Sequence, residues 1–149
     1  MTSVIGKAEI AALIPHAGAM CLLDAVRFWD SATVVCVASS HRDPDHPMAR
    51  DGRLDAVCGI EYAAQAMAVH GGLTAIAGRR PSAGYLASVR NVTCHEARLD
   101  QLGDDLKITA TRIAGDGAGA VYEFSLCSGS ATILQGRAAV VLDAGETAA

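Results

Sequence analysis

The chain has 149 residues, of which 51% are hydrophobic and 19% are charged, and its formal net charge is −4. This composition excludes an intrinsically disordered chain, and the length suits a single domain with a core of its own, so we expect one domain over residues 1–149. An acidic chain has no electrostatic attraction for nucleic acid and little for anionic lipid, so we expect neither partner.

Targeting and membrane signals are weak. Residues 1–7 lack the basic stretch and apolar segment of a signal peptide, so we expect a cytoplasmic protein. The most apolar stretch, residues 54–77, contains Glu61, Gln65 and His70, which are costly in hydrocarbon, so it predicts a buried helix rather than a membrane span. The five cysteines lack CxxC spacing, and we expect them to be small buried hydrophobes in a reducing compartment.

The N-terminal half begins with a short helix. Residues 8–15 have helical spacing and end at a proline, and residues 20–26 and 32–39 have the composition of strands. Residues 40–53 hold two histidines, two prolines, a glycine and several aspartates, which predicts a long irregular loop. Long loops inside small domains are often functional.

A long helix is predicted after this loop. It spans residues 56–77, is apolar nearly all round, and has Asp55 before it as a cap. The rest of the chain predicts four strands with turn-like separators, over residues 83–92, 105–113, 120–127 and 131–142. One helix enclosed by a curved antiparallel sheet is an α+β arrangement. Because a sheet covers only one side of a helix, we expect a second subunit to cover the other side, making a dimer.

Glu61 is the most informative residue, because it is the only carboxylate between residues 56 and 77. Burial of a carboxylate requires a partner or a raised pKa, and a carboxyl group in a dry pocket suits general acid–base chemistry. The alternative is a solvent gap or an ion pair with Arg79 or Arg80. Gln65 lies one helical turn further along, where it either holds the Glu61 carboxyl group or is a satisfied polar residue at an interface.

Histidine is the natural acid–base partner for Glu61, and five are present. His46 lies in the irregular loop before the helix, and Pro47 restricts it to an extended conformation. His41 lies in the same loop, and its charged neighbours favour solvent exposure. His16 follows the first helix, while His70 and His95 lie further along the chain. The spacing of histidines and cysteines indicates no metal site, and a GxSxG elbow for serine hydrolysis is missing.

Several segments resemble one family when they are taken in order. Residues 13–16 and 20–26 are similar to the "LPH…(F/M)LLVD" opening of the hotdog-fold 3-hydroxyacyl-[acyl-carrier-protein] dehydratases. Residues 59–68 resemble their "LEAMAQ" central helix, residues 84–89 the following strand, and residues 102–106 the later "GDxL" turn. The segment 59–71 is most similar to the dehydratase-like proteins of aryl polyene and xanthomonadin-type pigment clusters.

This resemblance implies a hotdog fold, a dimer, and dehydration of 3-hydroxyacyl thioesters without a cofactor. It implies that His46 is the base, that Glu61 from the partner's helix is the acid, and that the Ala56 amide is the oxyanion donor. It also places Gln65 and Tyr85 at the substrate. In this sequence Asp55-Ala56 replaces the Pro-Gly of better-known members, and 61 − 46 = 15 residues separate histidine and carboxylate instead of fourteen.

The implied partner is an acyl carrier protein, which is acidic and carries a phosphopantetheine phosphate. Arg79, Arg80 and Arg90 are the candidate basic patch for this partner, although each is also an ordinary surface arginine. Two alternatives share the fold: a thioesterase that uses the helix carboxylate to activate water, and a non-catalytic subunit that completes a heterodimer with a related hotdog protein.

Overall fold

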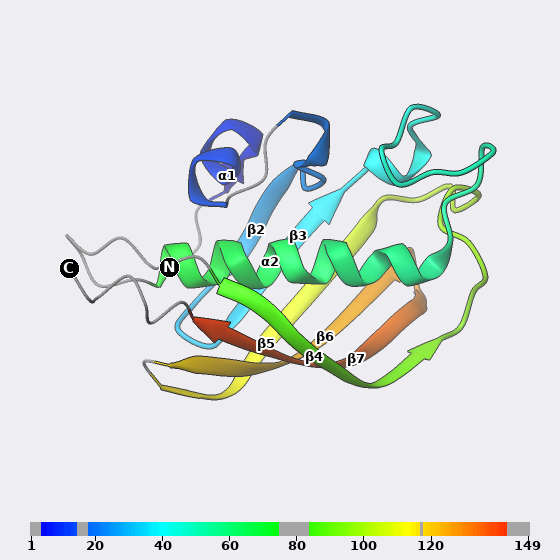
Figure 1. Cartoon of the computed structure of the whole chain (residues 1–149). Coiled ribbons are helices and arrows are strands. Elements are labelled where there is room, and N and C mark those ends of the chain that lie inside the picture. Colours follow the sequence, from blue (N-terminus) through cyan, green and yellow to red (C-terminus); the bar gives the residue numbers. More distant parts are fainter. Residues whose placement is uncertain (1–3, 15–17, 75–83, 117, 143–149) are drawn as a thin grey trace.

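The computed structural model describes residues 4–14, 18–74, 84–116 and 118–142, and its elements are labelled in Figure 1. The two α-helices are α1 (Lys7–Leu13) and α2 (Gly59–Leu73). Three short 3₁₀ helices lie at Gly18–Met20, Ser40–Arg42 and Ala56–Cys58. The strands are β1 (Ile5–Gly6), β2 (Ala25–Trp29), β3 (Thr33–Ala38), β4 (Gly84–Cys94), β5 (Leu106–Asp116), β6 (Gly119–Ser128) and β7 (Ala131–Leu142).

All the described strands belong to one antiparallel sheet, in the order β1-β2-β3-β5-β6-β7-β4. The sheet curves around α2, which runs across it, and α1 lies beside α2 on the side away from β7 (Figure 1). The predicted α+β arrangement, one long helix enclosed by a curved antiparallel sheet, is therefore confirmed. None of the described helices is long and apolar enough to cross a membrane.

Alternation along the strands builds the core. On the inner face of the sheet, every second residue is buried, including Val34 and Cys36 on β3 and Leu106 and Ile108 on β5. These side chains form one cluster with the buried residues of α2: Tyr62, Ala63, Ala66, Met67 and Val69. Gly59 lets α2 approach the sheet closely, because a Cβ there would lie 2.8 Å from Leu134 and 2.9 Å from Leu126.

The predicted strand over residues 20–26 is correct only at its end. Residues 20–24 are a buried turn whose backbone is bonded outside any ladder: Leu22 N–H donates to the Gln65 side chain and Asp24 N–H to Val37 O. An apolar run of this length does not distinguish a strand from a buried turn. The predicted capping role of Asp55 is also wrong, because its carboxylate accepts from Arg53 Nε and makes no cap hydrogen bond.

The cysteine prediction holds in part. Cys21 and Cys36 are buried, and burial raises the pKa of the Cys36 thiol to about 12. Cys58 and Cys127 are half-buried, and Cys94 is exposed near the end of β4. Exposure at Cys94 follows from its position, since β4 lies at the edge of the sheet.

His70 fastens α2 to the sheet through a buried polar contact. The ring is fully buried, its Nε2–H donates to Asp30 O (2.9 Å), and its Nδ1 accepts from the Tyr122 hydroxyl (2.7 Å). Both nitrogens are used by a neutral imidazole, and burial lowers its pKa. His41 and His46 are also buried, and burial lowers the pKa of each.

We predict that acid destabilises this fold through its buried histidines. Each is neutral when folded and has a lowered pKa, so the unfolded chain binds protons first, below its ordinary value of ~6.5. The free energy of unfolding should therefore fall as the pH drops below that value, by up to about 1.4 kcal/mol per pH unit for each histidine. Urea unfolding at pH 7.5, 6.0 and 5.0 measures the change. A flat profile would contradict the account.

Candidate active site

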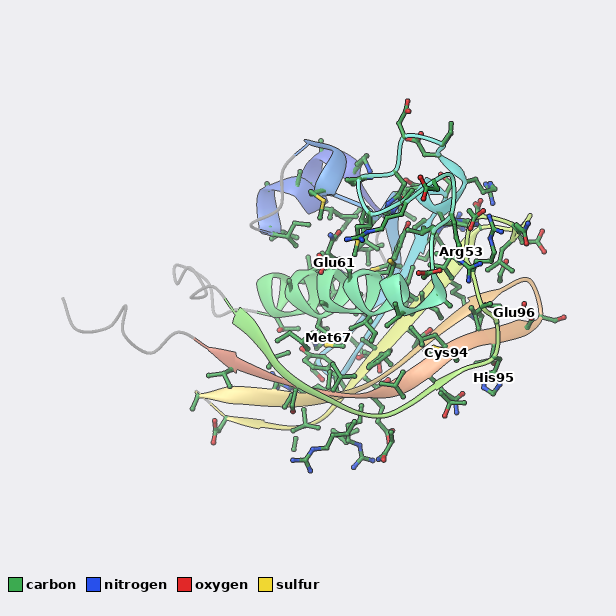
Figure 2. The ribbon with its side chains drawn as sticks, turned by 45° about the vertical axis from the view of Figure 1, so that its right-hand side comes forward. Arg53, Glu61, Met67, Cys94, His95 and Glu96 are labelled. Atoms are coloured by element: carbon green, nitrogen blue, oxygen red, sulfur yellow. The ribbon has the colours of Figure 1, made fainter. Side chains whose placement is uncertain are left out.

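Glu61 lies in the first turn of α2, where the positive end of the helix dipole favours a carboxylate. The side chain is half-buried, on a stripe of α2 that the described part of the chain leaves partly open at Ile60, Ala64 and Ala68. Figure 2 shows Glu61 on the side of α2 toward α1 and the loops, whereas Met67 lies on the side toward the sheet. The acidic group is thus presented on the face of α2 away from the sheet.

Gln65 holds this carboxylate. Its fully buried amide donates from Nε2 to Glu61 Oε2 (3.0 Å) and to Met20 O (2.7 Å), and its Oε1 accepts from Leu22 N–H (2.9 Å). The amide therefore satisfies the backbone of the turn over residues 20–22 and binds Glu61 at the same time. Of the two roles open from the sequence, the contact to Glu61 is present.

His46 is almost fully buried, with 5% of its surface exposed. Its Nδ1 accepts from Met48 N–H (3.0 Å), and its Nε2 lies 3.0 Å from the Tyr62 hydroxyl. The Tyr62 hydroxyl in turn lies 2.7 Å from Ser40 Oγ. Within one chain, the described contacts of His46 are thus to Tyr62 and Met48 and not to Glu61. Its predicted role as base pairs it with Glu61 from a second subunit.

The Ala56 amide does not have the freedom that the resemblance implies. Its N–H donates to Ala97 O (3.0 Å), and Leu99 N–H donates to Leu54 O (2.8 Å). An isolated antiparallel bridge thus joins residues 54–56 to residues 97–99, and beside it Leu54 N–H donates to the Asp100 carboxylate. The predicted oxyanion donor is occupied in this arrangement, in which Asp55 has extended backbone.

Among the other predicted site residues, the structure describes one side chain. Arg90 is exposed on β4. Tyr85 belongs to the same strand, but its side chain lies outside the described residues, as do Arg79, Arg80 and His16. His41 contradicts its predicted exposure: it is 1% exposed, because it packs under residues 102–105 and donates to Leu102 O.

Sequence reasoning missed three members of this cluster. Tyr62 and Ser40 were assigned no function, and Leu22 contributes only backbone groups. The sequence signal for Tyr62 is a tyrosine on an apolar helix next to Glu61. A buried tyrosine hydroxyl needs a hydrogen-bond partner, so a polar contact could be expected there. In the described residues, no three His, Cys, Asp or Glu side chains gather closely enough to hold a metal ion.

Comparison with known proteins places the chain in a family. The family model for ApeP-like proteins, described as ApeP dehydratase, matches residues 8–148. The chain belongs to the ApeP-like dehydratase family. The dehydratase heterocomplex ApeI:P from Xenorhabdus doucetiae is similar to this family member at 25% identity over 90% of each chain, with a TM-score of 0.80. The search of curated proteins found no match to the present chain.

Two thioesterase structures show the same fold as this ApeP-like chain. Zebra fish thioesterase superfamily member 2 has a TM-score of 0.62 at 19% identity, over 92% of this chain and 95% of that one. A thioesterase from Haemophilus influenzae has a TM-score of 0.66 at 11% identity, over 95% and 93%. At these identities the similarity concerns the fold alone. The fold is the hotdog fold, as the sequence resemblance implied.

We predict that Gln65→Leu is strongly destabilising, although leucine fits an apolar helix. The substitution leaves the buried Leu22 N–H and the part-buried Met20 O without their side-chain partner, which costs roughly 2–4 kcal/mol in the free energy of unfolding. Urea unfolding measures the loss. The matched control is Gln135→Leu on the exposed face of β7, which should change the free energy by less than about 0.5 kcal/mol. Equal effects for the two variants would contradict the assigned role of Gln65.

Proposed function

We propose that this chain is a subunit of a dehydratase that converts 3-hydroxyacyl thioesters on an acyl carrier protein into trans-2-enoyl thioesters, in an aryl-polyene-type pathway. Family membership supports the reaction class. The 3-hydroxyacyl substrate and the acyl carrier protein are inferred from the sequence resemblance. The reaction removes one water and needs only acid–base groups.

The observation that carries this proposal is the Gln65-held carboxylate of Glu61 on the open stripe of α2. A general acid must be held at one position and must face a space that a substrate can enter. Gln65 fixes one oxygen of Glu61, and the half-buried Ala64 and Ala68 leave the neighbouring surface of α2 partly exposed.

In the proposed reaction, a base removes a proton from C2 of the acyl chain. The electron pair forms the C2–C3 double bond, and the C3–O bond breaks as the protonated Glu61 carboxyl group gives its proton to the leaving hydroxyl. Enoyl thioester and water are released. The base then holds one proton more and Glu61 one fewer, and exchange with solvent restores both groups.

We propose that the base comes from a second, related hotdog subunit. Both nitrogens of His46 are engaged inside this chain, so this histidine has no free lone pair to offer the acyl chain. The likeness to a structure described as a dehydratase heterocomplex supports a pair of different subunits. β4 is an edge strand, and its outer side offers backbone groups for such pairing. Arg90, exposed on β4, is the described residue of the proposed carrier-docking patch.

We predict that Glu61→Gln abolishes dehydration while leaving the fold and the subunit pair intact. The amide retains the shape of the side chain but cannot supply the proton, so the rate should fall about 10²–10⁴-fold. The enzyme is the complex purified from its own cells through a tag on this chain, and the substrate is 3-hydroxyacyl carrier protein followed by mass. Glu123→Gln on the outer face of β6 is the matched control and should keep the full rate.

Each product has one interpretation. Loss of one water that depends on Glu61 supports the proposal, and release of the whole acyl group would make the protein a thioesterase instead. Full activity in Glu61→Gln would leave a non-catalytic subunit. Turnover by this chain alone would place the base in this chain and overturn its assignment to the partner.

A further inference from the structure

We propose that His46 is a positioning residue for Glu61, acting through a relay of hydrogen bonds that runs over Tyr62, Ser40, Leu22 and Gln65, and that it is not the proton acceptor. The proposal rests on the proposed function, since it concerns how the acid is held. It differs from the resemblance, which gives His46 the role of base.

The neighbours of His46 fix its tautomer. Met48 N–H is a donor and points at Nδ1 from 3.0 Å, so Nδ1 carries a lone pair. The proton of the neutral ring is therefore on Nε2, where it faces the Tyr62 oxygen at 3.0 Å. The opposite tautomer would set two N–H groups against each other at Nδ1.

The donor and acceptor of each remaining hydrogen bond in the relay then follow. The Ser40 hydroxyl donates to Leu22 O (2.8 Å), because a carbonyl oxygen can only accept. The contact of 2.7 Å between Tyr62 and Ser40 therefore has the tyrosine as its donor. His46 donates to Tyr62, Tyr62 to Ser40, and Ser40 to the backbone of Leu22, with each hydroxyl proton used once.

Leu22 joins this chain of bonds to the acid. Its carbonyl oxygen accepts from Ser40, and its N–H donates to Gln65 Oε1 (2.9 Å). The same Gln65 amide donates to Glu61 Oε2 (3.0 Å). A shift of the Leu22 turn therefore moves the group that aims Glu61, so the loop of His46 and the acid are mechanically connected.

The surroundings of His46 oppose a role as base. The imidazole is 5% exposed, and neither nitrogen has a lone pair to offer while the Met48 and Tyr62 bonds persist. Burial also lowers its pKa, and burial raises the pKa of the Tyr62 hydroxyl to about 12, so that group keeps its proton at neutral pH. A base in this position would have to break the relay before every turnover.

The decisive comparison is between His46→Gln and Tyr62→Phe in the purified complex. Glutamine can accept from Met48 and donate to Tyr62, so a positioning role predicts kcat within about threefold of wild type. Phenylalanine leaves the imidazole in place but cuts the relay, so kcat should fall roughly 10–100-fold with KM little changed. His46→Ala should match Tyr62→Phe, and the double variant should be no worse than either.

The second buried histidine–tyrosine pair supplies matched controls. His70 is bonded to Tyr122 and to Asp30 O, and the described bonds of this pair do not lead to Gln65. Tyr122→Phe removes a buried hydroxyl of the same kind, and it should lower stability without changing kcat by more than about threefold. An equal loss of kcat in Tyr122→Phe and Tyr62→Phe would reduce the relay to a general effect of stability and overturn the proposal.

The proposal would be overturned if His46→Gln lowered kcat about 10²–10⁴-fold and removed the acidic limb of the pH–rate profile while Tyr62→Phe kept the wild-type rate. That result would identify His46 as the base. A complex without dehydratase activity would contradict the proposed function instead.

In that case the relay is tested by the ¹³C chemical shift of the Glu61 carboxyl group in the chain alone. Tyr62→Phe should move that signal and Tyr122→Phe should not, and the reverse result would exclude the relay.

Discussion

A buried amide on an apolar helix cannot remain without hydrogen-bond partners, and much of this structure follows from how Gln65 is satisfied. Its partners come from the turn over residues 20–22 and from Glu61, so one side chain binds a turn to α2 and fixes an acid. Had those partners been water, Glu61 would have had the freedom of any surface carboxylate. The hydrogen bond that helps satisfy the buried Gln65 amide is also the one that orients the Glu61 carboxylate.

Two histidine–tyrosine pairs set α2 in place from opposite directions. His70 and Tyr122 fasten the helix to the sheet at β6 and to the turn at Asp30. His46 and Tyr62 fasten it to the loop and to Ser40. A helix whose core contacts are mostly small residues gains little rotational specificity from packing alone. Directional hydrogen bonds at both ends therefore fix which face is turned away from the sheet, and that face carries Glu61.

The sequence predicted the long helix and most of the strands, and it offered the contact between Glu61 and Gln65 as one of two alternatives, because these depend on periodicity and on helical spacing. It did not predict the strand order, in which β4 pairs with β7 at the edge of the sheet and not with the next strand along the chain. It could not predict the state of His46 or the Ala56 amide. Both depend on partners distant in the chain or on one hydroxyl: Ala97 lies 41 residues after Ala56 (97 − 56), and Tyr62 lies sixteen after His46 (62 − 46). The turn at residues 20–24 was missed for the same reason, since its bonding depends on Gln65.

The central claim is that Glu61, aimed by Gln65, meets the hydroxyl group that leaves as water. A crystal structure of the complex with a phosphopantetheine-linked 3-hydroxyacyl amide, which has no thioester to hydrolyse, tests this claim most directly. The account predicts the 3-hydroxyl within about 3 Å of a Glu61 oxygen, with the Gln65 contact retained. A bound chain whose carbonyl carbon faces Glu61 across a water molecule, with the hydroxyl elsewhere, would contradict the claim and indicate hydrolysis.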